Sequence, residues 1–304
     1  MNPRLSVVIP AFNAENQVAD AVRAVISQPL PRESFECVVV DDCSKDGTAE
    51  AAHNAGAVVI RHATNRGPSA ARNTGVEAAR GEWIVFTDSD CVPSRRWLPS
   101  MLTAADAATR STLALAGKTV GLNSQTPAAR FMDLIGGLDA ENYLRHEVMP
   151  WAPSCNLAVR RADLLAVGGF DPGFLNYETP ELHLRLLDRF GGKVVCVPTA
   201  LVMHRHRATW REFWRQQKSY GRGYAHFMRR YSDRWPWSLR RELMAWARLV
   251  PIGLRAFTGR GDEGLMRRGI FLKHLAQRVG FSRAFYLKQF GHTDTTPSPV
   301  PASL

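Results

Sequence analysis

The sequence lacks a long apolar run, and it lacks cysteines at paired spacing. No stretch reaches the roughly 18 apolar residues that cross a bilayer, and the strongest candidate, Leu243 to Leu254, contains Arg248 and Pro251. Near the first residue, a short apolar run stops at Pro10, too soon for a secretory signal. The cysteines are five in number and include no Cys-x-x-Cys pair, which favours free thiols in a reducing compartment. We therefore expect a cytoplasmic chain.

Extremes of composition are absent as well. The 304 residues are 45% hydrophobic and 22% charged, which is typical of globular proteins. This composition excludes a wholly disordered chain, a collagen-like chain and a small disulfide scaffold. The length is enough for about two small domains.

Acidic residues are scarce only toward the C-terminus. Residues 204–290 hold 20 Lys and Arg against 5 Asp and Glu, while the rest of the chain holds 19 against 23, for a net charge of +11. Five of the eight tryptophans lie in the same basic segment. Such charge predicts a polyanionic neighbour: nucleic acid, a membrane or a phosphorylated substrate. The Pro-, Thr- and Ser-rich residues 291–304 are expected to remain disordered.

The first hundred residues alternate between buried-strand and amphipathic-helix patterns. The pattern predicts strands at residues 5–9, 37–40, 57–60 and 83–86, and helices at residues 15–27, 48–55 and 69–79. This alternation indicates βαβ units and a mostly parallel sheet. Ligands of such sheets bind at the carboxyl ends of the strands. Polar residues follow three of these strands: Asn13, Asp41 with Asp42, and Asp88 with Asp90.

Asp88-Ser89-Asp90 gives the sharpest indication of chemistry. Two carboxylates at positions i and i+2, just beyond a buried strand, can reach one hard cation such as Mg²⁺ or Mn²⁺. The alternative is a solvated turn that caps the next helix. The position after the fourth strand, with Asp41 and Asp42 after the second, favours the metal.

Several ordered motifs resemble family 2 glycosyltransferases. They are Ser-Val-Val-Ile-Pro-Ala-Phe-Asn at residues 6–13, Val-Val-Asp-Asp-Cys-Ser-Lys-Asp-Gly-Thr at 39–48, Asn-Arg-Gly-Pro-Ser-Ala-Ala-Arg-Asn-Thr-Gly at 65–75, Asp-Ser-Asp at 88–90 and Gly-Gly-Phe-Asp at 168–171. The resemblance covers residues 5–225. It implies a GT-A fold, which is Rossmann-like, a UDP- or GDP-sugar donor, inversion at the anomeric carbon and a divalent metal, Mn²⁺ or Mg²⁺.

The resemblance also assigns roles residue by residue. Pro10, Ala11 and Asn13 would line the nucleoside, and Asp41 or Asp42 would bind its base or ribose. Arg72 and Asp88 would lie near the nucleotide. The metal ligands would be Asp90, with Asp88 beside it, and His204, which follows a strand predicted at residues 194–197. Turn chemistry at Asn13, a surface ion pair at Arg72 and a plain surface histidine at 204 are the alternatives.

The sequence departs from the family at the expected catalytic base. The aspartate of the family's Glu-Asp pair falls on Thr179, whose hydroxyl cannot act as a base near neutral pH. Glu178 or Glu181 could take over this role. Alternatively, the acceptor could be a phosphate oxygen that needs no base, or the protein could be a degraded transferase. We favour Glu178, followed by Glu181, whose other role would be to stabilise a helix N-terminus.

Trp210 to Tyr224 resembles the basic, aromatic segment that follows the catalytic core in bacterial relatives that use lipid-linked or cell-envelope acceptors. Leu239 to Phe257 mixes apolar residues and arginines, as in a helix that lies in lipid headgroups; a packed helical subdomain is the alternative. We predict a GT-A catalytic domain at residues 1–208, with nucleotide-sugar binding in 1–92 and an acceptor half in 93–208. A basic helical extension would follow at 209–290.

The predicted function is sugar transfer from a nucleotide-sugar to a lipid-linked, polysaccharide or other envelope acceptor, at an anionic inner membrane face. A sugar nucleotidyltransferase is one alternative, but residues 8–20 lack the Gly-rich phosphate loop usual in that class. A nucleotide-sugar- or membrane-binding relative without turnover is another alternative, which Thr179 motivates.

Overall fold

The computed structural model describes residues 2–122, 124–145 and 149–286. The N-terminal half consists of β1 (Leu5–Ala11), α1 (Glu15–Ile26), the 3-10 turn η1 (Arg32–Ser34), β2 (Phe35–Asp41), α2 (Thr48–Asn54), β3 (Val58–Arg61), α3 (Pro68–Ala78) and β4 (Trp83–Phe86). The strands and helices predicted here are confirmed, with ends displaced by two residues at most. The predicted disordered tail lies outside the described residues.

The second half of the sheet domain is less regular. Its elements are β5 (Cys91–Pro93), α4 (Trp97–Asp106), β6 (Thr112–Gly121), α5 (Pro127–Leu134), α6 (Ala140–Leu144), the 3-10 turn η2 (Ser154–Asn156), β7 (Leu157–Arg160), α7 (Arg161–Ala166), α8 (Glu178–Phe190) and β8 (Lys193–His204). The predicted strand at 194–197 is the beginning of β8, which continues through Pro198 to His204.

One eight-stranded sheet holds all these strands, in the order β3-β2-β1-β4-β7-β6-β8-β5. The strands β3, β2, β1 and β4 run parallel, and β6 and β8 also pair in parallel. β7 runs antiparallel to both β4 and β6, and β5 runs antiparallel to β8. Parallel pairings therefore prevail, as predicted, and β7 joins the two parallel sets.

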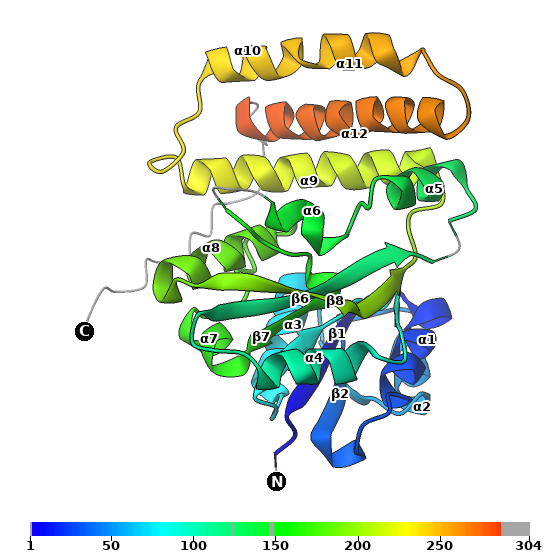
Figure 1. Cartoon of the computed structure of the whole chain (residues 1–304), viewed down its shortest axis with the longest axis vertical. Helices are drawn as coiled ribbons and strands as arrows, with labels where there is room; N and C mark the ends of the chain where they lie inside the picture. Colours follow the sequence, from blue (N-terminus) through cyan, green and yellow to red (C-terminus); the bar gives the residue numbers. More distant parts are fainter. Residues whose placement is uncertain (1, 123, 146–148, 287–304) are drawn as a thin grey trace.

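Helices cover both faces of the sheet (Figure 1). On one face, Val18 and Val22 of α1 and Trp97 of α4 pack on the strands; on the other face, Val76 of α3 and Leu182 of α8 do the same. β1, β2 and β4 are buried along almost their whole length and are mostly apolar, as expected of strands covered on both faces, whereas β3, at the edge of the sheet, is partly exposed. The α/β architecture predicted from the sequence is confirmed.

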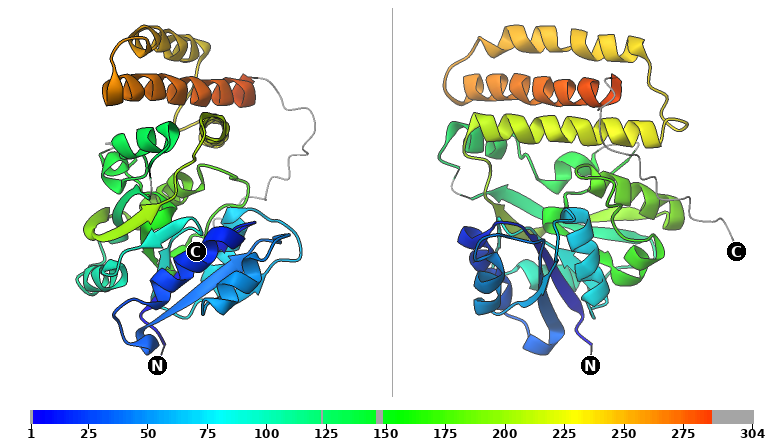
Figure 2. Two further views of the ribbon diagram at one scale, coloured as in Figure 1. Left: turned by 90° about the vertical axis from the view of Figure 1, so that its right-hand side faces the viewer. Right: turned by 180° about the vertical axis from the view of Figure 1, so that it is seen from behind.

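Four helices form a layer above one edge of the sheet: α9 (Trp210–Arg230), α10 (Leu239–Ala247), α11 (Leu249–Ala256) and α12 (Gly261–Tyr286). Figure 2 shows α9 next to the sheet domain, α12 above it, and α10 and α11 outermost. α9 and α12 approach closely at glycines, since a Cβ on Gly221 would lie 2.0 Å from the Gln277 carbonyl oxygen. A Thr209–Glu212 capping box starts α9.

The helical layer is also bound to the core. Phe131 of α5 is fully buried, and its ring contacts those of Trp210 and Phe213 on α9. Within the described part of the chain, none of the helices has the length and apolarity needed to cross a bilayer. The predicted helical extension is therefore present, and its inner side is packed.

Candidate active site

A cavity of about 870 Å³ lies between the sheet edge and the helical layer. Arg72, Asp88, Asp90, Glu178 and His204 line it, and all five are residues that the sequence singled out. They come from α3, the segment between β4 and β5, the start of α8 and the end of β8. The fold thus brings together side chains that lie more than 100 residues apart.

Arg72 is the centre of a buried ionic network. Its guanidinium donates to Asp88 Oδ1 at 2.9 Å and to Glu178 Oε1 at 3.1 Å, and its side chain is only 5% exposed. Burial by itself would lower its pKa, but the two carboxylates outweigh that effect and raise it. Arg72 therefore carries a permanent charge that positions both acids. A surface ion pair, the alternative for Arg72, does not describe this residue.

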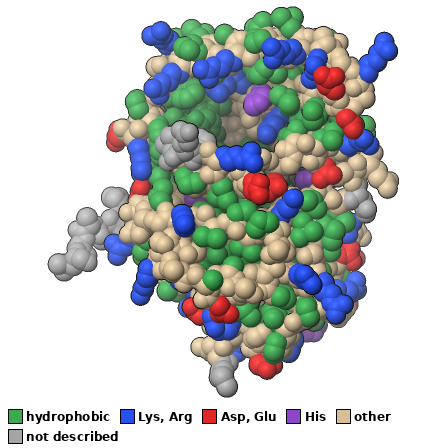
Figure 3. Space-filling view, viewed as in Figure 1, with side chains coloured by type: hydrophobic (Ala, Val, Ile, Leu, Met, Phe, Trp, Pro, Cys, Tyr) green, Lys and Arg blue, Asp and Glu red, His purple; other side chains and the backbone are tan. Residues whose placement is uncertain are grey.

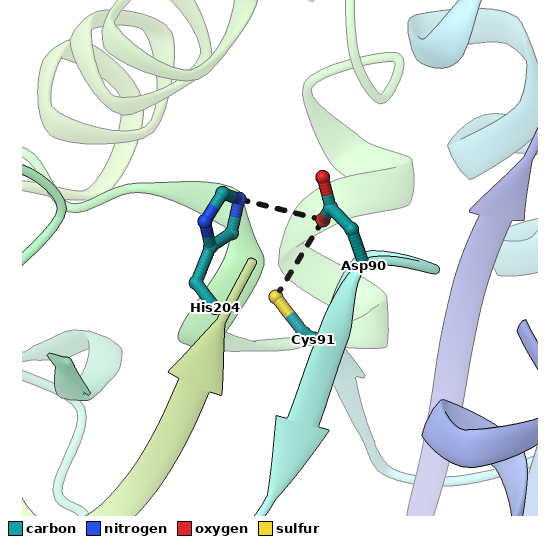
Figure 4. Close-up of side chains that lie close together, drawn as sticks. All are labelled: Asp90, Cys91 and His204. Atoms are coloured by element: carbon teal, nitrogen blue, oxygen red, sulfur yellow. Dashed lines mark hydrogen bonds and ion pairs between the residues drawn. The ribbon is translucent and has the colours of Figure 1, made fainter. Parts of the chain in front are cut away.

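Asp90 and His204, which both line the cavity, point toward each other (Figure 4). The distance from Asp90 Oδ1 to His204 Nε2 is 3.4 Å, and potential ligand atoms of Asp90, Cys91 and His204 all lie within 4.8 Å of one another. A carboxylate oxygen and an imidazole nitrogen suit Mn²⁺, and Mg²⁺ favours the carboxylate. Burial raises the pKa of the Cys91 thiol, which contacts Asp90 at 3.9 Å. The donor set at this position therefore fits a divalent cation.

Asp88 is not part of this cluster, although the sequence placed it beside Asp90 as a metal ligand. Its Oδ1 accepts from Arg72, and Asp88 is absent from the group of potential ligands around His204. Both aspartates line the cavity, but only Asp90 directly precedes β5, whose first residue, Cys91, pairs with His204 of β8. The structure thus places Asp88 beside Arg72 and Asp90 beside His204.

The other predicted donor residues lie at the ends of β1 and β2 and in the loops that follow these strands. Asn13 has a left-handed backbone, φ 49°, and its Oδ1 accepts from the Lys45 amide at 3.0 Å. Pro10 and Ala11 form the last part of β1, whose final residue pairs with Asp41. These residues lie at the predicted edge of the sheet, outside the lining of the cavity.

Asp41 and Asp42 differ in their partners. Asp42 accepts from the Arg66 and Gly67 amides and contacts His62 Nδ1 at 2.7 Å, so both of its oxygens are engaged inside the protein. Asp41 accepts from the Ser44 amide, and its other oxygen lies 3.1 Å from Nε of the half-exposed Arg61. Asp42 therefore holds the loop that contains Arg66 and Gly67. Asp41 is the carboxylate whose partner, the solvent-exposed Arg61, a ligand could displace.

The start of α8 separates the two predicted bases. Glu178 and Thr179 line the cavity. Glu181 lies outside the lining, and its oxygens accept two bonds from Arg185 at 2.7 Å and one from the Tyr231 hydroxyl at 2.8 Å. The geometry therefore does not support the second choice made from the sequence, because a carboxylate with three donors that faces away from the cavity cannot reach an acceptor. Burial raises the pKa of Glu178, against the effect of Arg72.

The far wall of the cavity comes from residues that no motif indicated. α9 contributes Arg215, Tyr220 and Arg222, and α12 contributes Lys273 and His274. Tyr177, the N-cap residue of α8 with a left-handed backbone at φ 75°, also lines the cavity, and its ring contacts Tyr224 and Phe227 of α9. From the sequence, only the basic and aromatic character of the α9 and α12 segment was predicted. The packing of α9 and α12 over the sheet edge was needed to place it.

The sequence matches the model of the glycosyl transferase family 2 over residues 6–164. The chain belongs to this family. A pre-mycofactocin glycosyltransferase of Mycobacterium tuberculosis is 29% identical over 76% of this chain and 48% of its own length. The chain thus spans about half of that relative.

Solved structures share the fold. A mannosyltransferase of Pyrobaculum calidifontis, in complex with GDP-Man and Mn²⁺, has a TM-score of 0.66 at 17% identity, over 95% of this chain and 89% of its own. S. aureus TarS 1-349, in complex with UDP-GlcNAc, has a TM-score of 0.53 at 19% identity, over 93% of this chain and 91% of its own. The GT-A fold expected from the motifs is confirmed.

Proposed function

We propose that this chain is a metal-dependent glycosyltransferase that moves a sugar, with inversion, from a UDP- or GDP-sugar to a cell-envelope acceptor. The observation that carries the proposal is the meeting of Asp90, His204, Arg72 and Glu178 in one cavity of a family 2 core. The structural relatives with a bound nucleotide-sugar, one of them with Mn²⁺, support the same donor chemistry.

The donor residues have separate tasks in this proposal. The base or ribose displaces Arg61 and binds the carboxylate of Asp41. Pro10 and Ala11 at the end of β1, and Asn13 in the following loop, lie next to it. Asp90 and His204 hold the divalent ion, and Asp88 stays on the nucleotide side with Arg72. A divalent ion supplies Lewis acidity at the departing diphosphate. The guanidinium of Arg72 holds Asp88 and Glu178 in position.

Glu178 is the proposed general base. It lines the cavity with a side chain that is 14% exposed, and a carboxylate with a raised pKa is a stronger base than an ordinary one. We expect Glu178→Gln to lower kcat by about 10²–10⁴-fold, with the affinity for nucleotide and Mn²⁺ kept. Glu178 must be ionised to act as a base, so wild-type kcat should rise with pH. The midpoint of that rise should lie above 4.5, the ordinary pKa of a glutamate.

The exposed Glu263→Gln serves as the matched control, since its carboxylate lies on the surface of α12 in an ion pair with Arg267. Steady-state kinetics on both variants, with circular dichroism to check folding, decide the assignment. Full activity in folded Glu178→Gln would refute Glu178 as the base. An inactive wild type that still binds the nucleotide would favour a relative without turnover.

The outer face of α10 and α11 is proposed to lie on an anionic membrane. Leu239, Leu243, Val250, Leu254 and Phe257 are each at least 61% exposed there. Arg240 of α10 and Arg255 of α11 lie on the same two helices, and Arg248 lies at the junction between them. Apolar side chains among arginines fit a headgroup region, where each cation adds about 1 kcal/mol.

Vesicle sedimentation tests the membrane proposal. Wild-type protein should sediment with phosphatidylglycerol vesicles at low salt and much less with phosphatidylcholine vesicles. Replacing both Leu254 and Phe257 by Ser should reduce the bound fraction severalfold. Leu165→Ser, at a residue of α7 that is 45% exposed, is the control on another face. Equal sedimentation of all three proteins would contradict the proposal.

A further inference from the structure

A second cavity, of about 730 Å³, lies within the helical layer. We call it the aromatic cavity, because rings make up much of its wall. Tyr224, Phe227, Trp235, Trp237 and Phe281 line it. The ring of Trp237 lies 5.0 Å from that of Phe281, and the ring of Phe227 lies 5.5 Å from that of Trp235. A site of this size and lining suits the apolar part of a small molecule.

The aromatic cavity adjoins the catalytic one. Four residues line both: Tyr177, Tyr220, His274 and Gln277. A ligand whose polar end lies beside Asp90 and Glu178 therefore has an apolar compartment directly next to it. This shared wall comes from α9, α12 and the residue that precedes α8. None of the roles proposed for the donor uses the aromatic cavity.

Three basic side chains that line the two adjoining cavities have no carboxylate partner among the described residues. Within residues 2–122, 124–145 and 149–286, no ion pair involves Lys273 or Arg215 of the catalytic cavity, or Arg248 of the aromatic cavity. Burial lowers the pKa of Lys273, which shows that its ammonium is partly withdrawn from water. A desolvated cation with no counter-charge favours an anionic ligand.

The roof of the aromatic cavity is also the proposed membrane face. Ala245 and Leu249 of α10 and α11 line the cavity, while Leu243 and Val250 of the same helices point outward and are exposed. On the face seen in Figure 3, basic side chains surround a hollow between the outer helices and the sheet domain. An amphiphile that leaves the membrane would thus contact α10 and α11 before it reaches the sheet domain.

We propose that the acceptor is a phosphate-bearing lipid, whose chain occupies the aromatic cavity and whose phosphate lies against Lys273 and Arg215. This inference rests on the proposed function and names its acceptor class. The phosphate places the acceptor's hydroxyl in the catalytic cavity. Glu178 takes the hydroxyl proton, the hydroxyl oxygen bonds to the anomeric carbon, and the bond from that carbon to the diphosphate breaks with its electron pair leaving on the nucleotide.

Calorimetry with dodecyl phosphate, below its critical micelle concentration, tests the proposal. Wild-type protein should bind dodecyl phosphate at least tenfold more tightly than either inorganic phosphate or dodecyl maltoside. Ala245→Phe fills the aromatic cavity from α10 and should weaken binding at least tenfold. Ala247→Phe adds the same ring at an exposed position outside the lining and should leave binding unchanged.

Lys273→Met supplies a second variant that does not depend on filling the cavity. It should weaken dodecyl phosphate about tenfold and leave dodecyl maltoside unaffected. Wild-type affinity in folded Ala245→Phe or in Lys273→Met would overturn the proposal, as would inorganic phosphate bound as tightly as dodecyl phosphate. Binding of UDP and GDP with Mn²⁺ is measured on the same samples. Loss of nucleotide binding in wild type would refute the proposed function instead.

Discussion

Replacing Asp90 by Asn should abolish metal-dependent transfer. We expect kcat/KM to fall by about 10³-fold or more, because a metal site at a departing diphosphate is worth several kcal/mol in the transition state. Asn keeps the shape of the side chain but removes the charge that a divalent ion and His204 share. Binding of UDP or GDP should also stop responding to Mn²⁺, and EDTA should reproduce the defect in the wild-type protein.

The matched control is Asp106→Asn, at an aspartate that is 53% exposed and pairs with Arg4 far from the cavity. Calorimetric titration with and without Mn²⁺ and a transfer or donor-hydrolysis assay supply the two readouts. Asp88→Asn provides a finer comparison. Because Asp88 pairs with Arg72 and lies outside the Asp90–His204 cluster, its variant should bind nucleotide more weakly yet keep its response to Mn²⁺. Unaltered Mn²⁺ dependence in Asp90→Asn would contradict the assignment.

Replacing Arg72 by Met should cost more folding stability than any other single change at the site. The guanidinium is 5% exposed and is the ion-pair partner of both Asp88 and Glu178. Its removal leaves two carboxylates facing each other with no cation between them. Breaking a buried pair from one side typically lowers the free energy of unfolding by about 3–5 kcal/mol. Arg72 also lies 5.5 Å over the Phe170 ring, a contact that the variant loses as well.

Urea denaturation of the wild type, Arg72→Met and Arg130→Met measures this effect. Arg130 forms a bidentate ion pair with Asp262, yet it is 55% exposed. Its variant should match the wild type, since exposed pairs add little. Raising the pH should enlarge the difference for Arg72→Met, because the two carboxylates ionise and repel. A midpoint for Arg72→Met equal to that of Arg130→Met would show that the network does not hold the site together.

Local patterns predicted the elements that bear the donor site. The buried strands up to Phe86 and the helices between them follow from periodicity, and the carboxyl ends of parallel strands gather Asn13, Asp41 and Asp88 at one edge. Local patterns could not predict which side chains from distant segments come into contact. Nothing local shows that Arg72 pairs with Glu178, 106 positions away.

The C-terminal half shows the same limit. Leu239 to Phe257 was predicted as one basic helix, but two helices meet at Arg248. Pro251 lies in the first turn of α11, where its missing N–H is tolerated, whereas it would disrupt a continuous helix. Glu181 fits the family pattern by its position in the chain. However, Glu181 lies outside the lining of the cavity, where its carboxylate accepts hydrogen bonds from Arg185 and from Tyr231, the residue that follows α9.

The most direct test of the account is to locate manganese by its anomalous scattering in crystals grown with Mn²⁺ and UDP or GDP. We predict a peak beside the Asp90 carboxylate, on the side of His204, with the nucleotide diphosphate next to it and the base near Asp41. A manganese peak elsewhere, or a nucleotide bound outside the cavity of Arg72 and Glu178, would contradict the proposed donor site.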